Sequence, residues 1–491
     1  MPKPITASML YNYVQCPRRV SLDLYGDPAD KDKVSAFVQL LWDRGNAFER
    51  EVIEGLKVPF TDLSALSDDA KEEATKEAMT RGDGLIYSGR IRSNDLLGEP
   101  DLLRRQGEGY AAGDIKSGAG EEGAEPEDKK PKKHYAVQLA LYTDILERIG
   151  MSAGRVPFVW DIHAEEIVYD LDALQGTRNP TALWSVYQEV LDKVAAISHE
   201  KARTLPAYSG ICKLCQWRTV CLRALTETKD LTLIPELGRA KRDAMMSHIK
   251  DINKLADADI STLIRGGKTV VPGIGPDTLR KFQARARLQV RKGRPVLTGP
   301  LDLPSHDLEI FFDIETDPMQ DICYLHGFVE RRNNDGAAER FISFYADDPT
   351  PEQEKRAFAS AWEYIKASRP CMIYYYSKYE RTIWRKLREK YPDVMTAEEV
   401  EEMFSPENSV DLYYDVVRSK TEWPTRDYSI KTLASYLGFS WRDTDPSGAS
   451  SIEWYHQWVK SRDEAVRERI LQYNEDDCIA TRVLLYGIRK L

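Results

Sequence analysis

Four carboxylates and one tyrosine in the last part of the chain have the spacing of a site that binds divalent metal ions. In the stretch EIFFDIET, Asp313 and Glu315 are two residues apart, so a strand would point both side chains to one face. Glu380 begins a helical pattern after a strand-like run, and Tyr473 and Asp477, four apart, share one face of a later helix. Carboxylate oxygens suit Mg²⁺ or Mn²⁺ as ligands. Two such ions would activate a water molecule and stabilise the leaving oxygen of a phosphodiester.

Two alternatives remain open for this group of acids. Asp476 is the nearest rival of Asp477 as the last carboxylate, although the spacing from Tyr473 favours Asp477. Each short motif also occurs by chance, so the acids could belong to a solvated surface. Their order and their spacing across a whole domain favour a metal site over that interpretation.

Three cysteines within ten residues predict a second metal centre. Cys212, Cys215 and Cys221 have the spacing Cys-x2-Cys-x5-Cys in a chain of seven cysteines. The other cysteines except Cys16 lie in the last part of the chain, so Cys16 is the candidate for a fourth ligand. Four thiolates could hold zinc or an iron–sulfur cluster, and the spacing does not choose between them. The alternative is a set of four unconnected core thiols.

A glycine turn that opens a basic helix predicts contact with a phosphate backbone. In the stretch VPGIGPDTLRKF, the turn at Gly273 and Gly275 would present backbone N–H groups to an anion, with Arg280 and Lys281 in the following turns. A fainter copy, IPELGRAKRDAM, comes before it. The alternative is a glycine turn in a small bundle with a solvated basic face. From residue 280 to residue 294 there are seven basic residues and no acid: Arg280, Lys281, Arg285, Arg287, Arg291, Lys292 and Arg294.

The elements that must position these residues divide the chain into three predicted domains. Residues 1–228 contain the cysteine cluster, 229–295 are helical and basic, and 296–491 alternate strand and helix patterns. The stretch KGRPVLTGPLDLPSHD is rich in proline and glycine, which predicts a linker before the last domain. We therefore expect an α/β multidomain protein in which a small all-α region joins two α/β domains.

Length and composition favour a globular chain with several cores. The chain has 491 residues, of which 42% are hydrophobic and 30% charged. Its net charge of −10 gives no general attraction to nucleic acid, so any basic face must be local. The N-terminus lacks the apolar segment of a signal peptide, and no apolar run reaches membrane-spanning length. We expect a cytoplasmic protein without a membrane partner and without a disulfide framework.

The C-terminal motifs resemble the ribonuclease H-like exonucleases of the DEDD type, in the variant with a tyrosine. Asp313 and Glu315 match the first motif of these enzymes, and Tyr473 with Asp477 match the third. Glu380 stands where the second motif usually has aspartate, which is one methylene shorter. The stretches VDLYYDVV, YSIKTLASYLGF and YNEDDC are most similar to the YprB-like branch, where a glutamate is accepted. The resemblance covers nearly all of residues 305–491 and implies a metal-dependent exonuclease site.

The glycine turn and the cysteines carry two further resemblances. The turn is similar to a helix-hairpin-helix motif, and tandem hairpins of this kind bind duplexes without reading bases. The cysteine pattern resembles the iron–sulfur RecB-type nucleases, such as the AddB nuclease domain and the CRISPR-associated RecB-like exonucleases. This second resemblance implies that Cys16, Cys212, Cys215 and Cys221 hold a four-iron four-sulfur cluster, with zinc as the alternative.

The RecB-type resemblance also implies a nuclease site between the first and the second of these cysteines. Asp101 lies in LLGEPDLLRR, and Asp114 and Lys116 are two apart in GYAAGDIKSG. By the resemblance, the two aspartates would hold a divalent metal, and the lysine would orient or activate the attacking water. Gln138 and Tyr142, four apart on a predicted helix, match the extra RecB motif near the DNA.

One departure from the RecB-type pattern bears on the activity of this site. Family members usually carry a metal-binding histidine followed by glutamate in the first helical motif, and here Phe48 takes the place of the histidine. Glu49 remains and Glu51 follows. Phenylalanine cannot bind metal, so the N-terminal site binds metal weakly, uses a carboxylate instead, or is inactive.

The order of the three domains resembles the RecB-like nuclease family that ends in a YprB-like domain. The resemblance implies a metal-dependent nuclease of the 3′–5′ exonuclease type, acting on DNA ends or single strands in repair, recombination or defence. Relatives are sometimes joined to helicases; this sequence has no G-x-x-x-x-G-K-[ST] loop, so a helicase would be a partner in trans. The alternatives are a non-catalytic iron–sulfur DNA-binding module that recruits other enzymes, and a ribonuclease.

Overall fold

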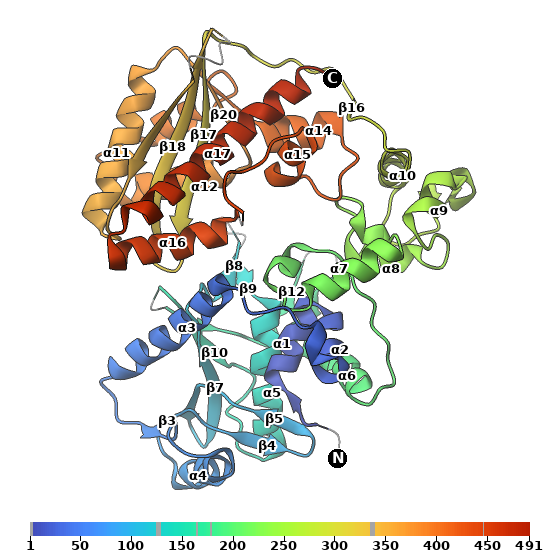
Figure 1. The fold of residues 1–491 in the computed structure, drawn as a ribbon. Coiled ribbons are helices and arrows are strands. Elements are labelled where there is room, and N and C mark those ends of the chain that lie inside the picture. Colours follow the sequence, from blue (N-terminus) through green and yellow to red (C-terminus); the bar gives the residue numbers. More distant parts are fainter. Residues whose placement is uncertain (1–2, 124–128, 164, 177–178, 334–338, 445) are drawn as a thin grey trace. The chain divides into compact units, whose positions relative to one another are not determined.

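The computed structural model describes residues 3–123, 129–163, 165–176, 179–333, 339–444 and 446–491 (Figure 1). Its contacts divide the chain into two compact units. The first comprises Met1–Pro206 and Gly210–Leu222, and the second comprises Ala207–Ser209 and Arg223–Leu491. Both units contain helices and sheets, which confirms the predicted α/β multidomain fold. The predicted boundaries near residues 228 and 295 stay predictions.

The first unit is built on a six-stranded sheet with the strand order β11-β10-β7-β6-β3-β2. Its central strand β7 is buried along its whole length and pairs antiparallel with β6 and parallel with β10. The strands are β2 (Thr61–Asp62), β3 (Leu85–Tyr87), β6 (Leu102–Gln106), β7 (Gly109–Ile115), β10 (Phe158–Trp160) and β11 (Glu166–Val168). A smaller sheet contains β1 (Ile5–Thr6), β5 (Leu96–Gly98) and β4 (Ile91–Ser93).

Helix α5 (Lys133–Arg148) forms the centre of the first unit, because ten of its sixteen residues are buried. It packs against α1, α6 and β7 in the main core of this unit. The other helices are α1 (Ala7–Gln15), α2 (Pro17–Tyr25), α3 (Ala36–Glu54), α4 (Asp68–Arg81), α6 (Leu183–Ser198) and α7 (Arg218–Glu227), whose last part belongs to the second unit.

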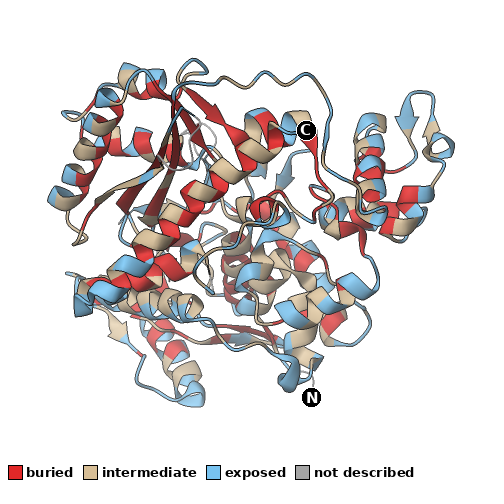
Figure 2. Ribbon diagram, turned by 45° about the horizontal axis from the view of Figure 1, so that its top comes forward, coloured by how far each residue is buried: buried red, intermediate tan, exposed pale blue. Residues whose placement is uncertain are grey.

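The second unit contains a five-stranded sheet with the order β19-β18-β17-β20-β21. Strands β17, β18 and β19 are antiparallel neighbours, while β20 and β21 run parallel to β17. Their bounds are β17 (Leu308–Asp317), β18 (Ile322–Arg332), β19 (Arg340–Tyr345), β20 (Met372–Tyr375) and β21 (Ser409–Asp411). Figure 2 shows that these strands are mostly buried, since helices cover both faces of the sheet.

The two faces of β17 contact different cores because successive side chains of a strand point to opposite sides. Ile310, Phe312 and Ile314 belong to a core with helices α11 and α12, whereas Phe311 lies in a core with α15 and the end of α17. The sheet-covering helices are α11 (Pro351–Ala367), α12 (Tyr379–Lys390), α13 (Ala397–Met403), α14 (Arg418–Lys420), α15 (Ile430–Tyr436), α16 (Gly448–Ser461) and α17 (Glu464–Ile488).

Residues 229–295 have a core of their own, in which leucine, isoleucine and phenylalanine side chains pack between three short helices. The helices are α8 (Gly238–Met245), α9 (Ile252–Asp257) and α10 (Pro276–Val290). A two-stranded hairpin of β14 (Ile264–Arg265) and β15 (Lys268–Thr269) lies between α9 and α10, so this mainly helical region is not entirely α. No helix within the described residues is long and apolar enough to cross a membrane.

Candidate metal centres

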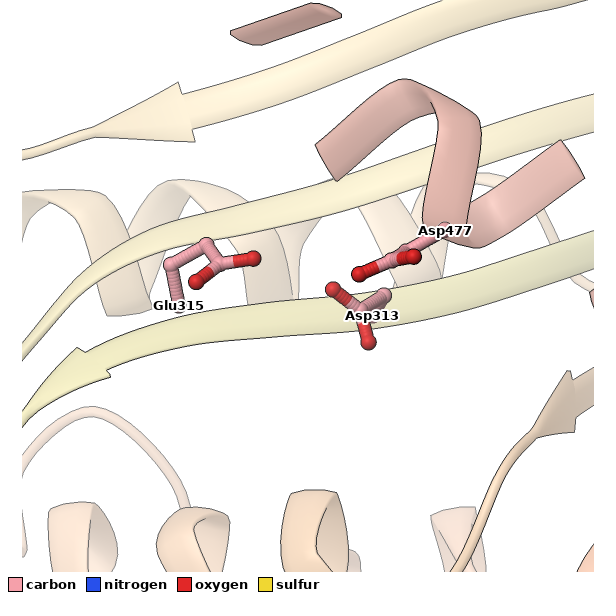
Figure 3. A group of neighbouring side chains, drawn as sticks. All are labelled: Asp313, Glu315 and Asp477. Atoms are coloured by element: carbon pink, nitrogen blue, oxygen red, sulfur yellow. The ribbon is translucent and has the colours of Figure 1, made fainter. Parts of the chain in front are cut away.

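Three of the five predicted C-terminal site residues meet at one point of the second unit. Asp313 and Glu315 come from β17, Asp477 comes from α17, and Figure 3 shows their carboxylates side by side. One oxygen of each lies within 4.8 Å of the others. An all-oxygen set of this kind suits a hard divalent cation such as Mg²⁺ or Mn²⁺.

Burial and the neighbouring acids make Asp313 and Glu315 harder to ionise. Burial raises the pKa of Glu315 to about 8, and the charge of Asp477 acts in the same direction. Burial also raises the pKa of Asp313 well above its usual range, with further contributions from Asp477 and Glu315. Such clustering of acids is unfavourable in the absence of a cation, so the arrangement favours binding of a positive charge.

Side chains around the cluster orient the carboxylates. Asn474 donates a hydrogen bond from Nδ2 to Asp313 Oδ2 at 2.7 Å, and Trp441 donates from Nε1 to Asp477 Oδ1 at 2.7 Å. Hydrogen bonds to metal-ligating carboxylates fix their orientation and commonly affect metal affinity. Both donors therefore support the positions of the two aspartates.

Tyr473 lies beside the cluster and is buried. Its hydroxyl oxygen accepts a hydrogen bond from the ammonium of Lys431 at 2.9 Å, and the same ammonium is 3.5 Å from Asp477 Oδ1. Burial raises the pKa of Tyr473 well above its usual range, as do the charges of the nearby acids, so the phenol stays protonated. A protonated phenol can donate a hydrogen bond to a water molecule at the carboxylates.

Glu380 lies in the first turn of α12 and is buried, but it is not one of the three acids whose oxygens lie within 4.8 Å of one another. Burial raises its pKa well above the usual range, and the charge of Glu380 in turn raises the pKa of Asp313. Within the described residues, its Oε2 is buried without a hydrogen-bond partner. A buried, unpartnered carboxylate oxygen near three other acids fits a role as a further metal ligand.

Asp476, the rival of Asp477, has a different environment. Its carboxylate accepts hydrogen bonds from the backbone N–H of Arg442 at 2.8 Å and from Arg442 Nε at 2.9 Å. Asp476 is therefore engaged in an ion pair, and Asp477 is the residue that joins Asp313 and Glu315.

In the first unit, Asp101, Asp114 and Lys116 lie at the pairing of β6 and β7. Asp101 immediately precedes β6, and its Oδ2 accepts a hydrogen bond from the backbone N–H of Ile115 at 2.7 Å. Lys116 Nζ is 2.8 Å from Asp114 Oδ2. Burial raises the pKa of Asp101 to about 8, Asp114 and Glu49 add to the shift, and Lys116 opposes it. The structure thus brings together all three predicted residues.

Phe48, which replaces the expected histidine, packs against the apolar core between α3 and the sheet. Glu49 lies near Asp101, since its charge raises the pKa of Asp101. The Glu49 carboxylate also accepts a hydrogen bond from the Tyr87 hydroxyl at 2.9 Å. Glu51 pairs instead with Arg44 at 3.0 Å and is largely exposed. Glu49 is therefore the carboxylate that could substitute for the missing histidine.

The other two predicted residues of the first unit lie on α5. Gln138 Nε2 donates a hydrogen bond to the Tyr142 hydroxyl at 3.2 Å, as their spacing of four allows. The same hydroxyl donates to the carbonyl of Glu99, two residues before Asp101. Tyr142 is buried and Gln138 half-buried, so Gln138 is the more accessible of the two.

All four predicted cysteine ligands are half-buried, and their thiols are close enough to affect one another. Burial raises the pKa of Cys221 to about 11, and the neighbouring Cys16, Cys215 and Cys212 act in the same direction. Cys16 stands at the junction of α1 and α2, and the other three lie in the segment Gly210–Leu222 of the same unit. Cysteine thiolates are ligands both of iron–sulfur clusters and of zinc, so the residue types alone do not choose between them.

The glycine turn before α10 has the backbone that was predicted for it. Gly273 has a φ of +74°, which a side chain would strain, and Gly275 precedes the first residue of α10. Both glycines and Arg280 are exposed, and Arg280 forms an exposed pair with Asp277 at 2.7 Å. Lys281 lies 3.7 Å from Glu236.

One residue of the basic tract 280–294, Arg285, does not lie on the surface as predicted. Arg285 is fully buried and forms an ion pair with Glu422 at 2.5 Å, so it cannot reach a nucleic acid. The basic residues within α10 point to different sides of the helix. Because one side of the helix packs against the rest of the protein, some of these residues must be buried.

Sequence reasoning missed three residues of the C-terminal site. Asn474 and Lys431 lie in the motifs YNEDDC and YSIKTLASYLGF, which signalled a family resemblance but no role. Trp441 lies outside these motifs. Their positions depend on contacts between segments far apart in the sequence.

Two segments of the chain match models of known protein families. Residues 21–222 match the PD-(D/E)XK nuclease superfamily, and residues 310–488 match the RNase_H superfamily. No curated protein matches the chain. The C-terminal site residues all lie within the second match. Both are superfamilies of nucleases that hydrolyse phosphodiesters, and such nucleases typically use divalent metals. This confirms the predicted combination: the chain carries a RecB-like domain of the PD-(D/E)XK nuclease superfamily followed by a domain of the RNase H superfamily.

Proposed function

We propose that the protein is a metal-dependent exonuclease that removes nucleotides in the 3′–5′ direction from DNA ends or single strands. The observation that carries this proposal is the convergence of Asp313, Glu315 and Asp477, whose oxygens lie within 4.8 Å of one another. Glu380 supplies a further carboxylate, which is buried, and Tyr473 supplies a buried phenol. Together they match the residue set of a tyrosine-type DEDD site, except that Glu380 stands in place of the usual second aspartate.

The residues of this site divide into metal ligands and residues that orient the attacking water. Asp313, Glu315, Asp477 and Glu380 would hold divalent metal ions, which when bound activate a water molecule and stabilise the leaving oxygen. Tyr473 orients the attacking water through its hydroxyl, and the ammonium of Lys431 holds that hydroxyl in place.

The RecB-like site of the first unit is a second, weaker candidate for catalysis. Asp101, Asp114 and Lys116 are in contact, and Glu49 provides a carboxylate nearby. Phe48 removes the histidine ligand, which lowers the metal affinity of this site relative to one with the full set. We therefore assign cleavage to the C-terminal site, with the half-buried Gln138 of the first unit contacting the nucleic acid. The predicted contact of Tyr142 is wrong, because this side chain is buried; it supports Gln138 through their hydrogen bond instead.

We further propose that the four cysteines hold a four-iron four-sulfur cluster that closes the first unit. The cluster would join the α1–α2 junction at Cys16 to the segment that contains Cys212, Cys215 and Cys221. Protein purified under anaerobic conditions should be brown and contain iron. A colourless preparation that contains zinc and no iron would replace the cluster by a zinc site.

We call residues 229–295 the hairpin region, after their resemblance to helix-hairpin-helix motifs. This region would bind the nucleic acid. Gly273 and Gly275 would present backbone N–H groups to a phosphate, and Arg280 and Lys281 would add positive charge. DNA is the proposed substrate, in repair, recombination or defence, with a helicase as a partner in trans. A pull-down that recovers no ATPase would contradict the helicase.

The decisive experiment is cleavage of end-labelled single-stranded DNA and RNA with Mn²⁺, comparing the wild type with Asp313→Ala and Asp114→Ala. We expect Asp313→Ala to abolish cleavage and Asp114→Ala to retain most of it. The opposite result would assign catalysis to the RecB-like site. Preference for RNA would make the protein a ribonuclease.

A second candidate function is a non-catalytic DNA-binding module that recruits other enzymes. Phe48 favours it for the first unit, since that side chain cannot bind metal. Absence of cleavage by the wild type with Mg²⁺ or Mn²⁺, together with DNA binding in a gel-shift assay, would support this function over the nuclease.

A further inference from the structure

Arg285 of α10 connects the hairpin region to the RNase H-like domain. Its side chain is fully buried, with Nε 2.5 Å and Nη2 3.3 Å from the two carboxylate oxygens of Glu422. Nη1 donates to the carbonyl of Pro235 at 2.7 Å and to Glu236 at 3.0 Å. One guanidinium therefore joins three segments: α10, the turn before α8, and strand β22 (Thr421–Glu422).

Further contacts hold the same two regions together. Gln289, one turn beyond Arg285, donates from Nε2 to the carbonyls of Leu233 at 3.1 Å and Thr425 at 2.9 Å. Strand β16 (Val296–Leu297), which follows α10, pairs antiparallel with β22. Tyr428 donates a hydrogen bond to Glu422 Oε2 at 2.6 Å, so this carboxylate is fully engaged.

The segment that receives Arg285 continues directly into the candidate metal site. After Tyr428, Ser429 caps the N-terminus of α15, and Asp427 accepts a hydrogen bond from the Ser429 backbone. Lys431 in the first turn of α15 then reaches Tyr473 at 2.9 Å. Eight residues lie between Glu422 and Lys431. The contact of α10 and the contact with the metal site thus belong to one continuous, capped segment.

The burial of Arg285 argues for a positioning role. A buried ion pair contributes little stability relative to apolar residues of the same size, but removal of one partner leaves an uncompensated buried charge. Such a pair therefore fixes one arrangement of the elements that it joins. Because Arg285 is fully buried, the pair cannot exchange its carboxylate for a phosphate.

We propose that Arg285 is a positioning residue that holds the basic helix α10 at a fixed place relative to the carboxylate site. The hairpin region then binds the duplex part of a substrate, and the carboxylate site cuts its single-stranded tail at a fixed distance from that duplex. This inference rests on the proposed nuclease function. It specifies the substrate as a duplex with a single-stranded tail. Digestion stops when the duplex reaches α10, which leaves a tail of defined length.

The test compares the tail lengths left by the wild type, Arg285→Met and Arg287→Met on a tailed, end-labelled duplex. Arg287 is a matched control for the position of α10, because it is an exposed arginine of the same helix whose Nε donates to the carbonyl of Ala256 inside the hairpin region. Its replacement removes one basic charge from the grip and weakens duplex binding, but it breaks no contact with the RNase H-like domain, so the length of the product should stay the same. We expect one narrow product from the wild type and Arg287→Met, and a broad ladder from Arg285→Met. Hydrolysis of bis(p-nitrophenyl) phosphate, which needs no grip, should stay within about threefold in all three proteins. An unchanged narrow product from Arg285→Met overturns the proposal.

A second variant covers the case in which Arg285→Met folds poorly. Arg285→Met with Glu422→Leu removes both charges, so no buried charge is left alone and thermal stability should return close to that of the wild type. This double variant should still leave a broad ladder. If it leaves the narrow wild-type product, the ion pair does not set the cutting distance.

A readout without cleavage separates this inference from the proposed function. The segment 291–307 between α10 and β17 contains Arg291 and Lys292, which are exposed and are not followed by proline, so trypsin can cleave after both. Loosening of α10 should speed cleavage there severalfold in Arg285→Met and leave Arg287→Met unchanged. Equal rates in both variants would overturn the positioning role, whereas a wild type that digests no substrate would overturn the nuclease function alone.

Discussion

At the scale of single residues, Asp476 and Asp477 show how much depends on the direction of a side chain. The two neighbours on α17 are both buried, yet Asp476 pairs with Arg442 and Asp477 joins the carboxylate cluster. Successive residues of a helix point about 100° apart, so they reach different partners. Their chemical identity makes them a matched pair for mutation.

Replacement of Asp477 by asparagine should reduce kcat by more than roughly 100-fold, because loss of a residue that merely supports a metal ligand already costs about 10- to 100-fold. Asp476→Asn should keep activity within a few-fold and lower thermal stability instead, since Arg442 loses one of its two carboxylate partners and keeps only Glu475. Steady-state cleavage kinetics and thermal melts would measure both. Equal losses of kcat in the two variants would contradict the assignment of Asp477.

The raised pKa of Glu315 predicts how stability changes with pH in metal-free protein. Between its ordinary value near 4.5 and the folded value of about 8, the folded state holds a proton that the unfolded chain releases. The free energy of unfolding should therefore fall as the pH rises through this range. Urea denaturation in EDTA at several pH values would measure the slope. Glu315→Gln should show a shallower slope, and an identical slope would rule out this carboxyl as a source.

At the scale of elements, the site depends on the close approach of α17 to the sheet. Gly327 of β18 pairs with Asp313, and a Cβ at this glycine would lie 1.6 Å from Oδ1 of Asn474. A distance this short is a steric clash, so only glycine allows Asn474 to reach Asp313. The absence of one side chain on β18 thus positions a hydrogen bond on the metal site.

Gly327→Ala should lower activity by roughly 10-fold or more, because Asn474 must move away from Asp313 and its support of the ligand is lost. Cleavage kinetics at increasing Mn²⁺ would show whether the loss lies in metal affinity. Gly448→Ala is a suitable control, since a Cβ at Gly448 meets nothing within 4 Å. Wild-type activity of Gly327→Ala would show that the Asn474 contact is dispensable.

At the scale of the whole molecule, each of the two units carries one candidate carboxylate site for a divalent metal, and the two can be studied separately. The candidate site of the first unit contains the acids Asp101, Asp114 and Glu49. The candidate site of the second unit includes Asp313 and Glu315. A ligand that binds the folded state alone stabilises the unit that contains its site. Metal binding should therefore be visible as a change confined to one unit.

Saturating Mn²⁺ should stabilise the second unit by about 2.7 kcal/mol at a concentration 100 times the Kd. Hydrogen exchange of peptides from β17 and α17 would measure this change. The double variant Asp313→Asn with Glu315→Gln should show no such protection, whereas Asp101→Asn should show it in full. Protection of these peptides in the double variant would place the metal elsewhere.

The sequence determined the features that depend on local periodicity. Asp313 and Glu315 face the same side because a strand repeats every two residues, and Tyr473 and Asp477 do so because a helix repeats every 3.6. The turn at Gly273 follows from the conformational freedom of glycine. The α/β architecture of both domains followed from alternating patterns of the same kind.

The tertiary structure decided which residues from distant segments meet. Lys431 and Trp441 come to Tyr473 and Asp477 only through packing of α15 and the following loop against α17, and no local pattern encodes those contacts. The same holds for Arg285, which sequence placed on the basic face. Charge alone does not tell whether an arginine faces water or a buried carboxylate, because that depends on which side of its helix packs against the rest of the protein.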